Sequence, residues 1–366
     1  FMHIFPKHIL DGVDFMNDKS FAQNPVGTGA FKFDSHLVNE SYTVVANEAY
    51  FKGAPKLKRI VFKILPDASV KVAQLRTGEL DVVTDIGAPE AAAIQGVDDL
   101  VLLTPATIAY WHMFINNTTP YTEDKRIRQA LHMAIDVEAI IASVMDGYGV
   151  RTAGPVGPPN GLRSNPDLQP YPYDPQGAIA LFAEAGWEDT DGDGILDKDV
   201  DGDGTRDPWQ DGIIIIPFMA AWADVGLVVQ QYWNDIGLDV TLRHYDTAEG
   251  FGLVRADEYI TYVGSRNPVP SSIDLSRYFG CDAPGNWFHY CNEEVDGLIA
   301  QAKETADEDA RRQLYYQAQE ILLDDQPSLV MFNVVDLQVI NKCVAGYNDK
   351  SVRFNFLDTH LFSKEC

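Results

Sequence analysis

Length, composition and charge already exclude several classes of protein. At 366 residues the chain is long enough for two domains, and its 46% of hydrophobic residues is typical of a globular chain and not of a disordered one. The 54 acidic and 28 basic side chains give a formal net charge of -26, and such a field repels nucleic acid and anionic membrane surfaces. The longest apolar run, residues 213–222, contains Pro217, so we expect a buried strand there and no membrane span.

In chain order, the first regular pattern is an amphipathic helix that ends at a glycine and is followed by an apolar strand. It predicts a helix over 68–77 before Gly78 and a strand over 80–84. The pattern recurs in a helix over 176–185 before Gly186 and in a helix over 224–236 before Gly237, with a strand over 238–244. A strand over 213–218 completes a β-α-β unit over 213–244, whose strands are parallel and whose crossover is right-handed. The predicted fold class is therefore α/β.

The sequence also predicts a loop rich in proline and two further helical regions, one just before the loop and one near the end of the chain. The spacing of apolar residues predicts a helix over 124–145, and residues 154–175 are then expected to be surface loop. Near the end of the chain, helices are predicted over 293–305 and 307–323, the second stopping before Pro327. An aliphatic strand over 329–332 follows them.

Aromatic and polar residues are dense in two stretches. The first, AYWHMFINN at 109–117, is predicted to be a strand whose alternation sends Tyr110 and His112 to one side and Trp111 and Met113 to the other. One side can line a cavity, and the alternative is plain core. The second, YITYVGSRNPVPSSID at 259–274, is predicted to be a loop that carries Ser265, Arg266 and Asn267. The Arg266 guanidinium can hold a carboxylate, although a surface salt bridge is the commoner role of an arginine.

The stretch DTDGDGILDKDVDGDGTRD at 189–207 has the residue types and spacing of calcium loops. Calcium prefers hard oxygen ligands, and alternate aspartates around a glycine supply them. The expected ligands are Asp189, Asp191, Asp193 and Asp197, repeated ten residues on by Asp199, Asp201, Asp203 and Asp207. The bidentate glutamate of an EF-hand is missing, so the loops are more similar to the short aspartate loops of dockerin or thrombospondin type 3 repeats. We favour weakly bound structural calcium over a solvated acidic hairpin without metal.

The four cysteines all lie in the last quarter of the chain and none forms a C-x-x-C pair. Their even number, the short gap between Cys281 and Cys291 and the acidic calcium-type segment favour an oxidising compartment. We predict disulfides between Cys281 and Cys291 and between Cys343 and Cys366. The alternative is four reduced thiols, which fits less well because Cys366 is the last residue of the chain and a thiol there has little core to occupy.

No signature of catalysis is found in the sequence. It contains no G-x-S-x-G, H-E-x-x-H, G-x-x-x-x-G-K-[ST] or G-x-G-x-x-G pattern. Paired carboxylates occur throughout so acidic a chain, so none stands out as an acid–base couple. We therefore expect no enzyme and no cofactor for function.

A series of ordered stretches resembles the solute-binding proteins of family 5, the extracytoplasmic peptide, dipeptide and nickel receptors of ABC importers. These stretches are IFPKHIL, NPVGTGAFKF, LRTGELDVVTDI, FINNTTPYTEDKRIRQALHMAID, YPYDPQGAIALFAEAGWEDTDGDGI, WNDIGLDVTL and NEEVDGLIAQAKETADEDARRQLYYQAQEILLDDQPSLVMF. Of these, R-I-R-Q-A-L-x-x-A-I-D and Y-D-P-x-x-A are specific by themselves. Members of the family often carry a shorter D-T-D-G-D-G-I after the same A-G-W, which favours a local role for the aspartate segment.

The resemblance implies two α/β lobes of the periplasmic-binding-protein type (class II) with a hinge between them. The first lobe would comprise residues 1–107 and 333–366, and the second residues 108–332. Members normally have a substantial stretch before I-F-P-K-H-I-L, so the resemblance also implies that part of the first lobe is missing from this chain. The start at Phe1 agrees with this, although processing would look the same.

The resemblance also suggests where a ligand binds. It places Tyr110, Trp111, His112 and Met113 on a crossing strand that faces the cleft, and closure would bring this strand against the loop at 265–267. Ser265 takes the place of the aspartate that binds the ligand's amino terminus in many peptide binders. A neutral serine beside Arg266 suits an anionic or hydroxyl-rich ligand better than a free amino group, because an unpaired buried ammonium is costly. Further candidates are the aromatic residues Trp222, Tyr245 and Trp287.

The resulting hypothesis is a monomeric receptor, secreted or anchored by a lipid, that closes around a small peptide or peptide-sized polar solute. The closed form would dock on the permease subunits of an ABC transporter. Two alternatives from other classes remain. In a calcium-dependent surface or matrix protein, the aspartate doublet would be the working part. A secreted hydrolase would need a nucleophile or paired acids that the sequence does not reveal.

Overall fold

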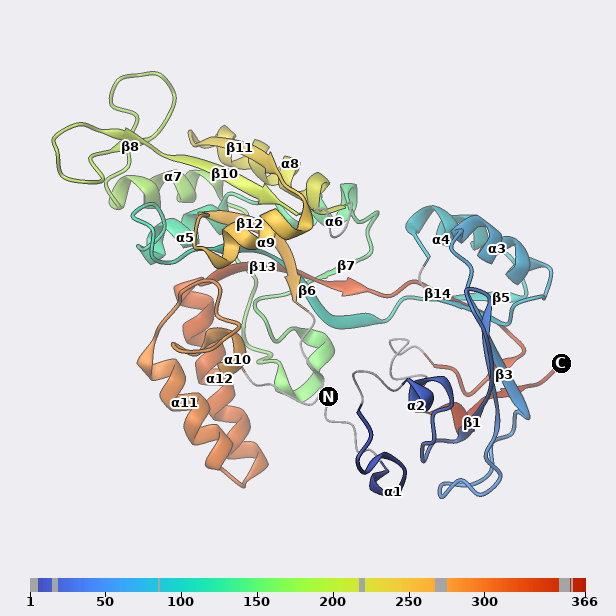
Figure 1. The fold of residues 1–366 in the computed structure, drawn as a ribbon. Coiled ribbons are helices and arrows are strands. Elements are labelled where there is room, and N and C mark those ends of the chain that lie inside the picture. The colour runs from blue at the N-terminus through green and yellow to red at the C-terminus, as the bar shows by residue number, and fades with distance from the viewer. Residues whose placement is uncertain are drawn as a thin grey trace. The chain divides into compact units, whose positions relative to one another are not determined.

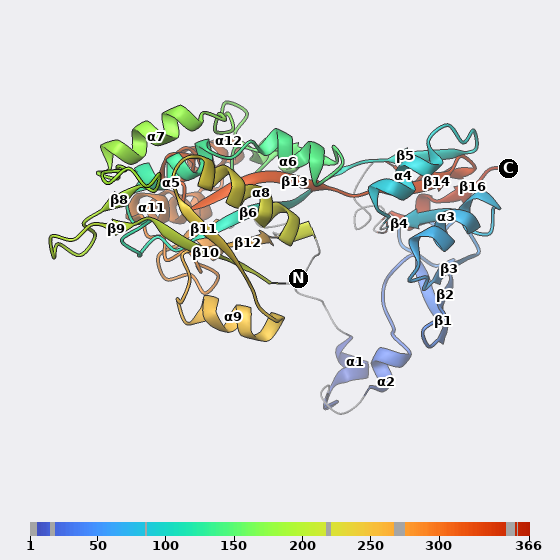
Figure 2. The same cartoon turned by 90° about the horizontal axis from the view of Figure 1, so that it is seen from above.

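The computed structural model describes residues 6–14, 19–84, 86–216, 221–266, 275–348, 356 and 358–366, apart from the side chain of Leu162. The chain divides into two compact units (Figures 1 and 2). Unit 1 comprises residues 1–106 and 335–366, and unit 2 comprises residues 107–334. The chain passes between them at the start of β6 (Ala106–Ile115) and at the end of β13 (Ser328–Val335). Whether the two units are lobes that close on a ligand stays a prediction.

The described residues of unit 1 form two three-stranded sheets and one two-stranded sheet. The order of the first is β1-β2-β3 and that of the second is β4-β14-β5, so that β14, from the end of the chain, lies between two strands from its first third (Figure 1). The strands are β1 (Phe31–Leu37), β2 (Ser41–Ala46), β3 (Arg59–Lys63), β4 (Val82–Thr84), β5 (Leu100–Leu103) and β14 (Gln338–Asn341), with the short pair β15 (Val344–Ala345) and β16 (Ser363–Lys364). The helices are α1 (Lys7–Leu10), α2 (Ser20–Gln23), α3 (Ala68–Arg76), α4 (Ala88–Ile94) and the 3-10 turn η2 (Thr359–Leu361).

Local sequence explains where α3 begins and ends. The Asp67 side chain accepts hydrogen bonds from the backbone N–H groups of Ser69 and Val70, which caps the first turn. Two residues after the helix, Gly78 adopts a φ of 76°, which glycine reaches without steric cost. The predictions of a helix over 68–77 and a strand over 80–84 are confirmed by α3 and β4.

Unit 2 is built on a mixed sheet of order β11-β10-β12-β6-β13-β7. Its other strands are β7 (Gly149–Arg151), β10 (Gln210–Ile215), β11 (Asp239–His244) and β12 (Thr261–Arg266), and β8 (Asp197–Lys198) and β9 (Asp207–Pro208) form a separate hairpin. The helices are α5 (Lys125–Met133), α6 (Val137–Ser143), α7 (Pro175–Glu184), α8 (Ala221–Asp235), α9 (Thr247–Arg255), α10 (Ser276–Phe279), α11 (Glu293–Glu304), α12 (Glu308–Asp325) and the 3-10 segment η1 (Pro158–Arg163). In the part of the chain that the structure describes, no helix is both long and apolar enough to cross a bilayer.

The predicted β-α-β unit is confirmed. Strands β10 and β11 are parallel and pair from Gln210 with Asp239 onward, and α8 connects them. Gly237 lies between α8 and β11 and adopts a φ of 90°, which glycine reaches without steric cost. On α8, Trp233 is fully buried and donates its indole N–H to the carbonyl of Leu131 at 2.9 Å, which ties the helix to α5. The α/β class predicted from the sequence is therefore the observed one.

Two element predictions were wrong. The helix expected over 124–145 is divided into α5 and α6, because Asp136 caps a new helix by accepting the backbone N–H of Ala139. The segment 259–274 was expected to be a loop, but its residues 261–266 form β12 in the centre of the sheet. Polar Ser265 and Arg266 suggested a loop, whereas the pairing of β12 with β6 on one side and with β10 on the other decides for a strand.

Candidate functional site

The candidate site lies on one face of the pair β6 and β12. The strands are antiparallel, with Tyr110 opposite Arg266, His112 opposite Gly264, and Phe114 opposite Tyr262. Residues directly opposite each other in antiparallel strands project to the same face, and so do alternate residues of one strand. Aromatic rings, an imidazole and a guanidinium are thereby brought together from two distant parts of the chain.

Arg266 is the cation of this face. Its guanidinium carbon lies 4.7 Å from the ring centroid of Phe114, 4.6 Å from that of Tyr278 and 4.7 Å from that of Trp287. It also donates a hydrogen bond to the carbonyl of Gly285 at 3.1 Å. Among the described residues, no carboxylate forms an ion pair with it, so aromatic faces hold the cation in place of an anion.

His112 lies beside this cation and is fully buried. Its ring centroid is 3.9 Å from that of Phe114 and 5.1 Å from that of Tyr110, and neither ring nitrogen has a hydrogen-bond partner among the described residues. Burial, and secondly the charge of Arg266, holds the pKa of His112 well below its ordinary value. The imidazole is therefore neutral at physiological pH and offers one donor and one acceptor.

Gly264 makes the close packing of the rings sterically feasible. A Cβ atom at this position would lie 2.6 Å from the ring of Phe114, which is closer than carbon atoms approach. Because Gly264 has no Cβ atom, the ring of Phe114 can stack on that of Tyr262 with the ring centroids 3.9 Å apart. Burial raises the pKa of the Tyr262 hydroxyl well above its ordinary value, and that hydroxyl has no partner among the described residues. The face thus carries several buried polar groups whose hydrogen-bonding capacity is unused.

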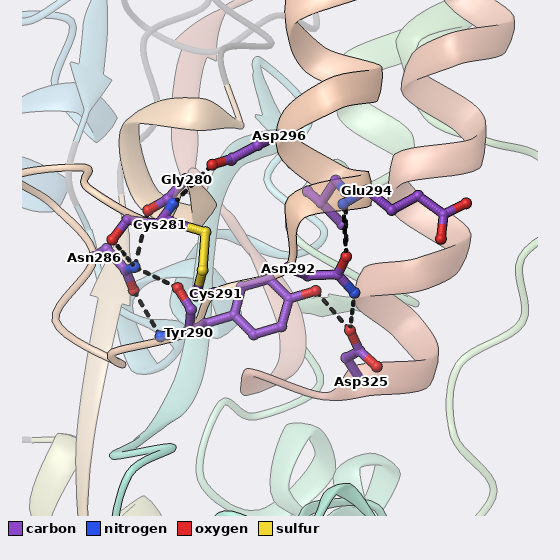
Figure 3. Close-up of a disulfide and its surroundings, with 10 residues drawn as sticks. Gly280, Cys281, Asn286, Tyr290, Cys291, Asn292, Glu294, Asp296 and Asp325 are labelled. Atoms are coloured by element: carbon purple, nitrogen blue, oxygen red, sulfur yellow. Dashed lines mark hydrogen bonds between the residues drawn. A yellow bond between two sulfur atoms is a disulfide. The ribbon is translucent and has the colours of Figure 1, made fainter.

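A disulfide holds the segment that supplies two of the rings around Arg266 (Figure 3). Cys281 and Cys291 are bonded, and Trp287 and Phe288 lie between them in the sequence. Inside the loop, Asn286 donates to the carbonyls of Gly280 at 2.9 Å and of Tyr290 at 2.6 Å. This cross-linking holds the rings near Arg266 before any ligand arrives, and such preorganisation reduces the cost of binding.

Hydrogen bonds also tie the end of this segment to α12 (Figure 3). The hydroxyl of Tyr290 donates to the carboxylate of Asp325 at 2.6 Å, and Asn292 donates to the same oxygen at 2.9 Å. The disulfide predicted between Cys281 and Cys291 is confirmed, as is the one between Cys343 and Cys366.

The other predicted ligand residues are placed differently. Trp111 lies on the opposite face of β6, with its ring 6.3 Å from that of Trp222 and 5.6 Å from that of Phe332. Both tryptophans and Met113 are buried in the main core of unit 2, and half-buried Tyr245 packs against that core. Phe114, Tyr262 and Phe288 of the Arg266 face belong to the same core, so burial does not distinguish the two faces. Alternation places Trp111, Met113 and Ser265 on the face opposite to Arg266, and neither Trp222 nor Tyr245 is among the rings around the guanidinium. Asn267 lies outside the described residues.

The expectation that closure brings 110–113 against 265–267 was wrong. Ser265 is opposite Trp111 in one sheet of one unit, so these residues are neighbours without any movement. The sequence analysis also missed Tyr278 and Phe288, which complete the aromatic surroundings of Arg266. Only the concentration of aromatic residues around the predicted disulfide could have drawn attention to them.

The aspartate segment forms two loops with matching hydrogen bonds, which project from unit 2 around β8 and β9 (Figures 1 and 2). In the first loop, the Asp189 carboxylate accepts the N–H groups of Gly192 at 2.7 Å and Gly194 at 3.1 Å. In the second, Asp199 accepts those of Gly202 at 2.7 Å and Gly204 at 3.0 Å. The repeat seen in the sequence is therefore a repeat in structure.

Each loop gathers three carboxylates. Oxygen atoms of Asp189, Asp191 and Asp193 lie within 4.8 Å of one another, and those of Asp199, Asp201 and Asp203 do the same. The remaining two predicted ligands lie outside these triads. Asp197 forms an ion pair with Arg206 and accepts the hydroxyl of Thr190, and Asp207 accepts the N–H of Val200 at 3.3 Å.

Comparison with known proteins identifies the class to which this fold belongs. The family model for bacterial extracellular solute-binding proteins, family 5 (middle), matches residues 2–285. The chain belongs to this family of extracytoplasmic binding proteins, which confirms the resemblance found in the sequence.

Individual relatives are similar over most of this chain. It is 28% identical to the oligopeptide-binding protein AppA of Bacillus subtilis over 94% of this chain and 64% of that protein. It is 27% identical to the dipeptide-binding protein of Escherichia coli over 88% of this chain and 59% of that protein. The chain thus spans about 60% of the length of these relatives.

Solved structures agree in fold. The structure of AppA from B. subtilis in complex with a nonapeptide superposes with a TM-score of 0.74 at 25% identity, covering 99% of this chain and 72% of that one. HbpA2 from Haemophilus parasuis gives a TM-score of 0.83 at 25% identity, covering 99% of this chain and 69% of that one.

Proposed function

We propose that this protein is the solute-binding receptor of an ABC importer and that it captures a small peptide or a peptide-sized polar solute. The observation that carries the proposal is the family match over residues 2–285. Relatives named as oligopeptide-binding and dipeptide-binding proteins support the ligand class. The proposed partners are the permease subunits, the proposed location is the periplasm or the cell surface with or without a lipid anchor, and the receptor is a monomer that performs no catalysis.

Arg266 is the proposed anchor for an acidic group of the ligand. Its side chain is half-buried, and rings and a carbonyl surround it without neutralising its charge. A ligand carboxylate would form a charge-assisted hydrogen bond with this preorganised fork. Neutral His112 and the hydroxyl of Tyr262 are further groups of the same face with unused hydrogen-bonding capacity.

The proposed movement is a closure of unit 1 and unit 2 around the ligand. The chain crosses between the units twice, near residues 106 and 335, and few backbone torsions there would suffice for a hinge. Closure would exclude water from the bound solute and present a new surface to the permease. This step is inferred from the division of the chain and from the family to which it belongs.

Matched tripeptides test both the function and the anchor. We expect Ala-Ala-Ala with a free carboxyl terminus to raise the melting temperature and lower the radius of gyration. Its carboxyl-terminal amide should bind about tenfold more weakly, because one charge-assisted hydrogen bond is lost. The amino-acetylated peptide should bind nearly as well as the free one, because the groups of this face, Arg266, His112 and Tyr262, include no anion for an ammonium. Calorimetry measures the three affinities.

Two arginine variants control this experiment. Arg266→Gln should remove the preference for the free carboxylate, whereas Arg277→Gln should keep it, since Arg277 also lies over the ring of Tyr278 but is exposed. An Arg266→Gln protein that still discriminates between acid and amide would rule out the anchor. An unchanged melting temperature across a broad panel of peptides and sugars would contradict the receptor itself.

We also propose that the two aspartate loops bind calcium as a structural ion. Each triad supplies three hard oxygens, which is half of the minimum of six that calcium prefers, so carbonyl groups and water must supply the rest. Such a site is weak and suits a calcium-rich exterior. The bound ion would stabilise only these two loops of unit 2. The loops contain none of the residues that surround Arg266. The function of a calcium-dependent matrix protein is not favoured, because the family match extends far beyond these loops.

A further inference from the structure

Two residues with a left-handed backbone bind each other beside the Arg266 face. Asp257 follows α9 and has a φ of 63°, and His289 lies in the disulfide loop, residues 281–291, and has a φ of 55°. The Nε2 atom of His289 is 2.6 Å from Oδ1 of Asp257. A left-handed backbone is unfavourable for any residue that has a Cβ atom. The contact between the two side chains therefore has to offset a cost at both positions.

Asp257 occupies a position where a helix end normally has a glycine. The N–H of Glu258 donates to the carbonyl of Leu253 at 3.0 Å, and that of Asp257 donates to the carbonyl of Val254 at 3.4 Å. This is the Schellman arrangement, in which glycine is preferred because the backbone is left-handed. The end of α9 thus gives no reason for an aspartate, whereas its carboxylate has a partner in His289. Local rules of this kind are broken mainly where a side chain has another role.

His289 directly follows two of the rings that surround Arg266. The ring centroids of Trp287 and Phe288 lie 4.7 Å and 5.7 Å from the guanidinium carbon of Arg266. Asn117 holds the main chain between them, because its backbone and side-chain N–H groups donate to the carbonyl of Phe288 at 2.8 Å and 2.9 Å. These bonds fix Phe288 to the end of β6, and other contacts hold the ring of Trp287.

Trp287 is packed between Arg266 and the segment that contains Asp257. The indole meets the ring of Phe251 on α9 edge to face, with the ring centroids 6.1 Å apart. The carbonyl of Trp287 accepts the hydroxyl of Tyr259, which lies two residues after Asp257. Helix α9, the connection to β12 and the disulfide loop therefore meet around Trp287, and the carboxylate of Asp257 supplies the exposed bond between the connection and the loop.

We propose that Asp257 and His289 are positioning residues of the Arg266 face. Their pair joins the connection between α9 and β12 to the disulfide loop and thereby keeps the ring of Trp287 against the guanidinium. The inference rests on the proposed role of Arg266 as the anchor for a ligand carboxylate. A guanidinium that rings hold in place has fewer orientations to lose when a carboxylate binds, so the pair raises affinity through preorganisation. It acts on the ligand only through Trp287 and Arg266.

Magnetic resonance of the full chain without ligand tests the positioning. The probe is the Nε–H resonance of Arg266, identified by its loss in Arg266→Gln. Asp257→Gly removes the carboxylate but suits the left-handed backbone, so the melting temperature should stay near that of the parent while the resonance moves, because the ring current of Trp287 changes. Asp257→Asn keeps an oxygen acceptor and should keep the resonance in place. Asp146→Gly is the matched control, since exposed Asp146 also has a left-handed backbone, with a φ of 49°.

Calorimetry then measures whether the positioning serves binding. Asp257→Gly should bind Ala-Ala-Ala about fivefold more weakly than the parent, which corresponds to one cation–π contact. It should bind the carboxyl-terminal amide as the parent does, because the amide carries no charge for Arg266. The inference is overturned if the Arg266 resonance is the same in Asp257→Gly and the parent, whether or not peptides bind. It is also overturned if the resonance moves and the affinity for Ala-Ala-Ala does not change, and the receptor function then stands. A parent protein that binds no peptide contradicts the receptor function instead, and the resonance still decides whether the pair positions Trp287.

Discussion

Gly264 and Arg266 show how single residues shape the proposed binding face. The missing side chain of Gly264 leaves room for Phe114 to stack on Tyr262, and Arg266 then lies over the ring of Phe114. A larger residue at 264 would have to displace this ring, and the surroundings of the cation would change with it. The site therefore depends on a residue that has no side chain of its own.

Asp211 is a second residue with an unusual environment. It is 5% exposed on β10, accepts the hydroxyl of Thr261 on β12, and lies near Arg243 on β11. Burial raises its pKa to about 7, although the Thr261 hydroxyl, the N–H of Gly212 and the charge of Arg243 oppose the rise. The protonated form is thus favoured in the fold and the ionised form in the unfolded chain.

We predict that this carboxyl makes the protein less stable as the pH rises from 6 to 8. A folded-state pKa above the unfolded one contributes stability at low pH that is lost as the pH passes through the folded value, here about 7. The free energy of unfolding falls by about 1 kcal/mol over this window. Asp211→Asn keeps an acceptor for the Thr261 hydroxyl and should remove this fall in stability between pH 6 and 8. Urea unfolding of both proteins at several pH values measures it.

His132 contributes to the same pH window with the opposite sign. Burial lowers its pKa from 6.5 to about 4, so near pH 6.5 the unfolded chain binds this proton and the folded protein does not, and His132 makes the protein more stable as the pH rises. Comparison of the parent with Asp211→Asn cancels this contribution, because both proteins contain His132. The contribution of Asp211 is the parent curve minus the Asp211→Asn curve. If the two curves stay parallel from pH 6 to 8, Asp211 does not titrate in this range.

At the scale of elements, the two aspartate loops behave as copies of one unit. Asp191 accepts the N–H of Asp193 at 3.1 Å, and Asp201 accepts that of Asp203 at 3.0 Å, so each triad has the same internal hydrogen bonds. Equal geometry should give equal affinity for an ion. It also means that each loop can be altered without touching the other.

We predict that calorimetric titration with calcium shows two weak and similar sites, one for each triad. Asp191→Asn should remove one site and Asp201→Asn the other, whereas Asp235→Asn, an exposed acid on α8, should remove neither. Chelation should leave peptide affinity nearly unchanged, because the loops are separate from the Arg266 face. No heat of binding at millimolar calcium would mean that the loops are held by their hydrogen bonds alone.

Arg128 connects two elements of unit 2 in a way that the sequence did not reveal. It is buried on α5 and donates to the carbonyls of Thr122 and Glu123 at 2.8 Å, and to that of Asp325 at 2.7 Å. The guanidinium thus satisfies carbonyl groups at the end of α12 that have no partner within their own helix.

For the whole molecule, the important feature is that each unit has its own core and its own disulfide. The Cys281–Cys291 bond lies in unit 2, and the Cys343–Cys366 bond lies in unit 1. Ile340, Tyr347 and Phe362 form a buried cluster in unit 1 that is separate from the large core of unit 2. Units with separate cores can unfold in separate transitions.

We predict two calorimetric transitions, each sensitive to one disulfide. Replacing Cys343 and Cys366 by serine should destabilise unit 1 by about 3 kcal/mol, because a closed loop then opens in the unfolded state. Replacing Cys281 and Cys291 should lower the transition of unit 2 by a similar amount. Hydrogen exchange assigns each transition to its unit. A single transition that both variants shift equally would show that the units unfold together.

Much of the fold was predictable because it depends on neighbours in the sequence. Apolar spacing and the stop at Gly78 located α3, and the run at 213–218 located β10. The candidate site was predictable only in part. Tyr110, His112, Arg266 and Trp287 do come together, but Trp111 and Trp222 lie in the core on the other face. Alternation along β6 separated these residues, but both faces are buried, and which rings pack on each face depended on distant parts of the chain.

By itself the sequence determined the α/β class, the family and the positions of several helices, since caps, glycine stops and periodicity act over a few residues. The sequence predicted the disulfide pairing from the short gap between Cys281 and Cys291 but left reduced thiols as an alternative, and the structure decided for the two disulfides. Only the tertiary structure decided that Ser265 and Arg266 lie in a strand and that rings surround the arginine. Those features depend on which strands become neighbours. Asn116, for example, donates a hydrogen bond to the carbonyl of Tyr259, which is 143 residues further along the chain.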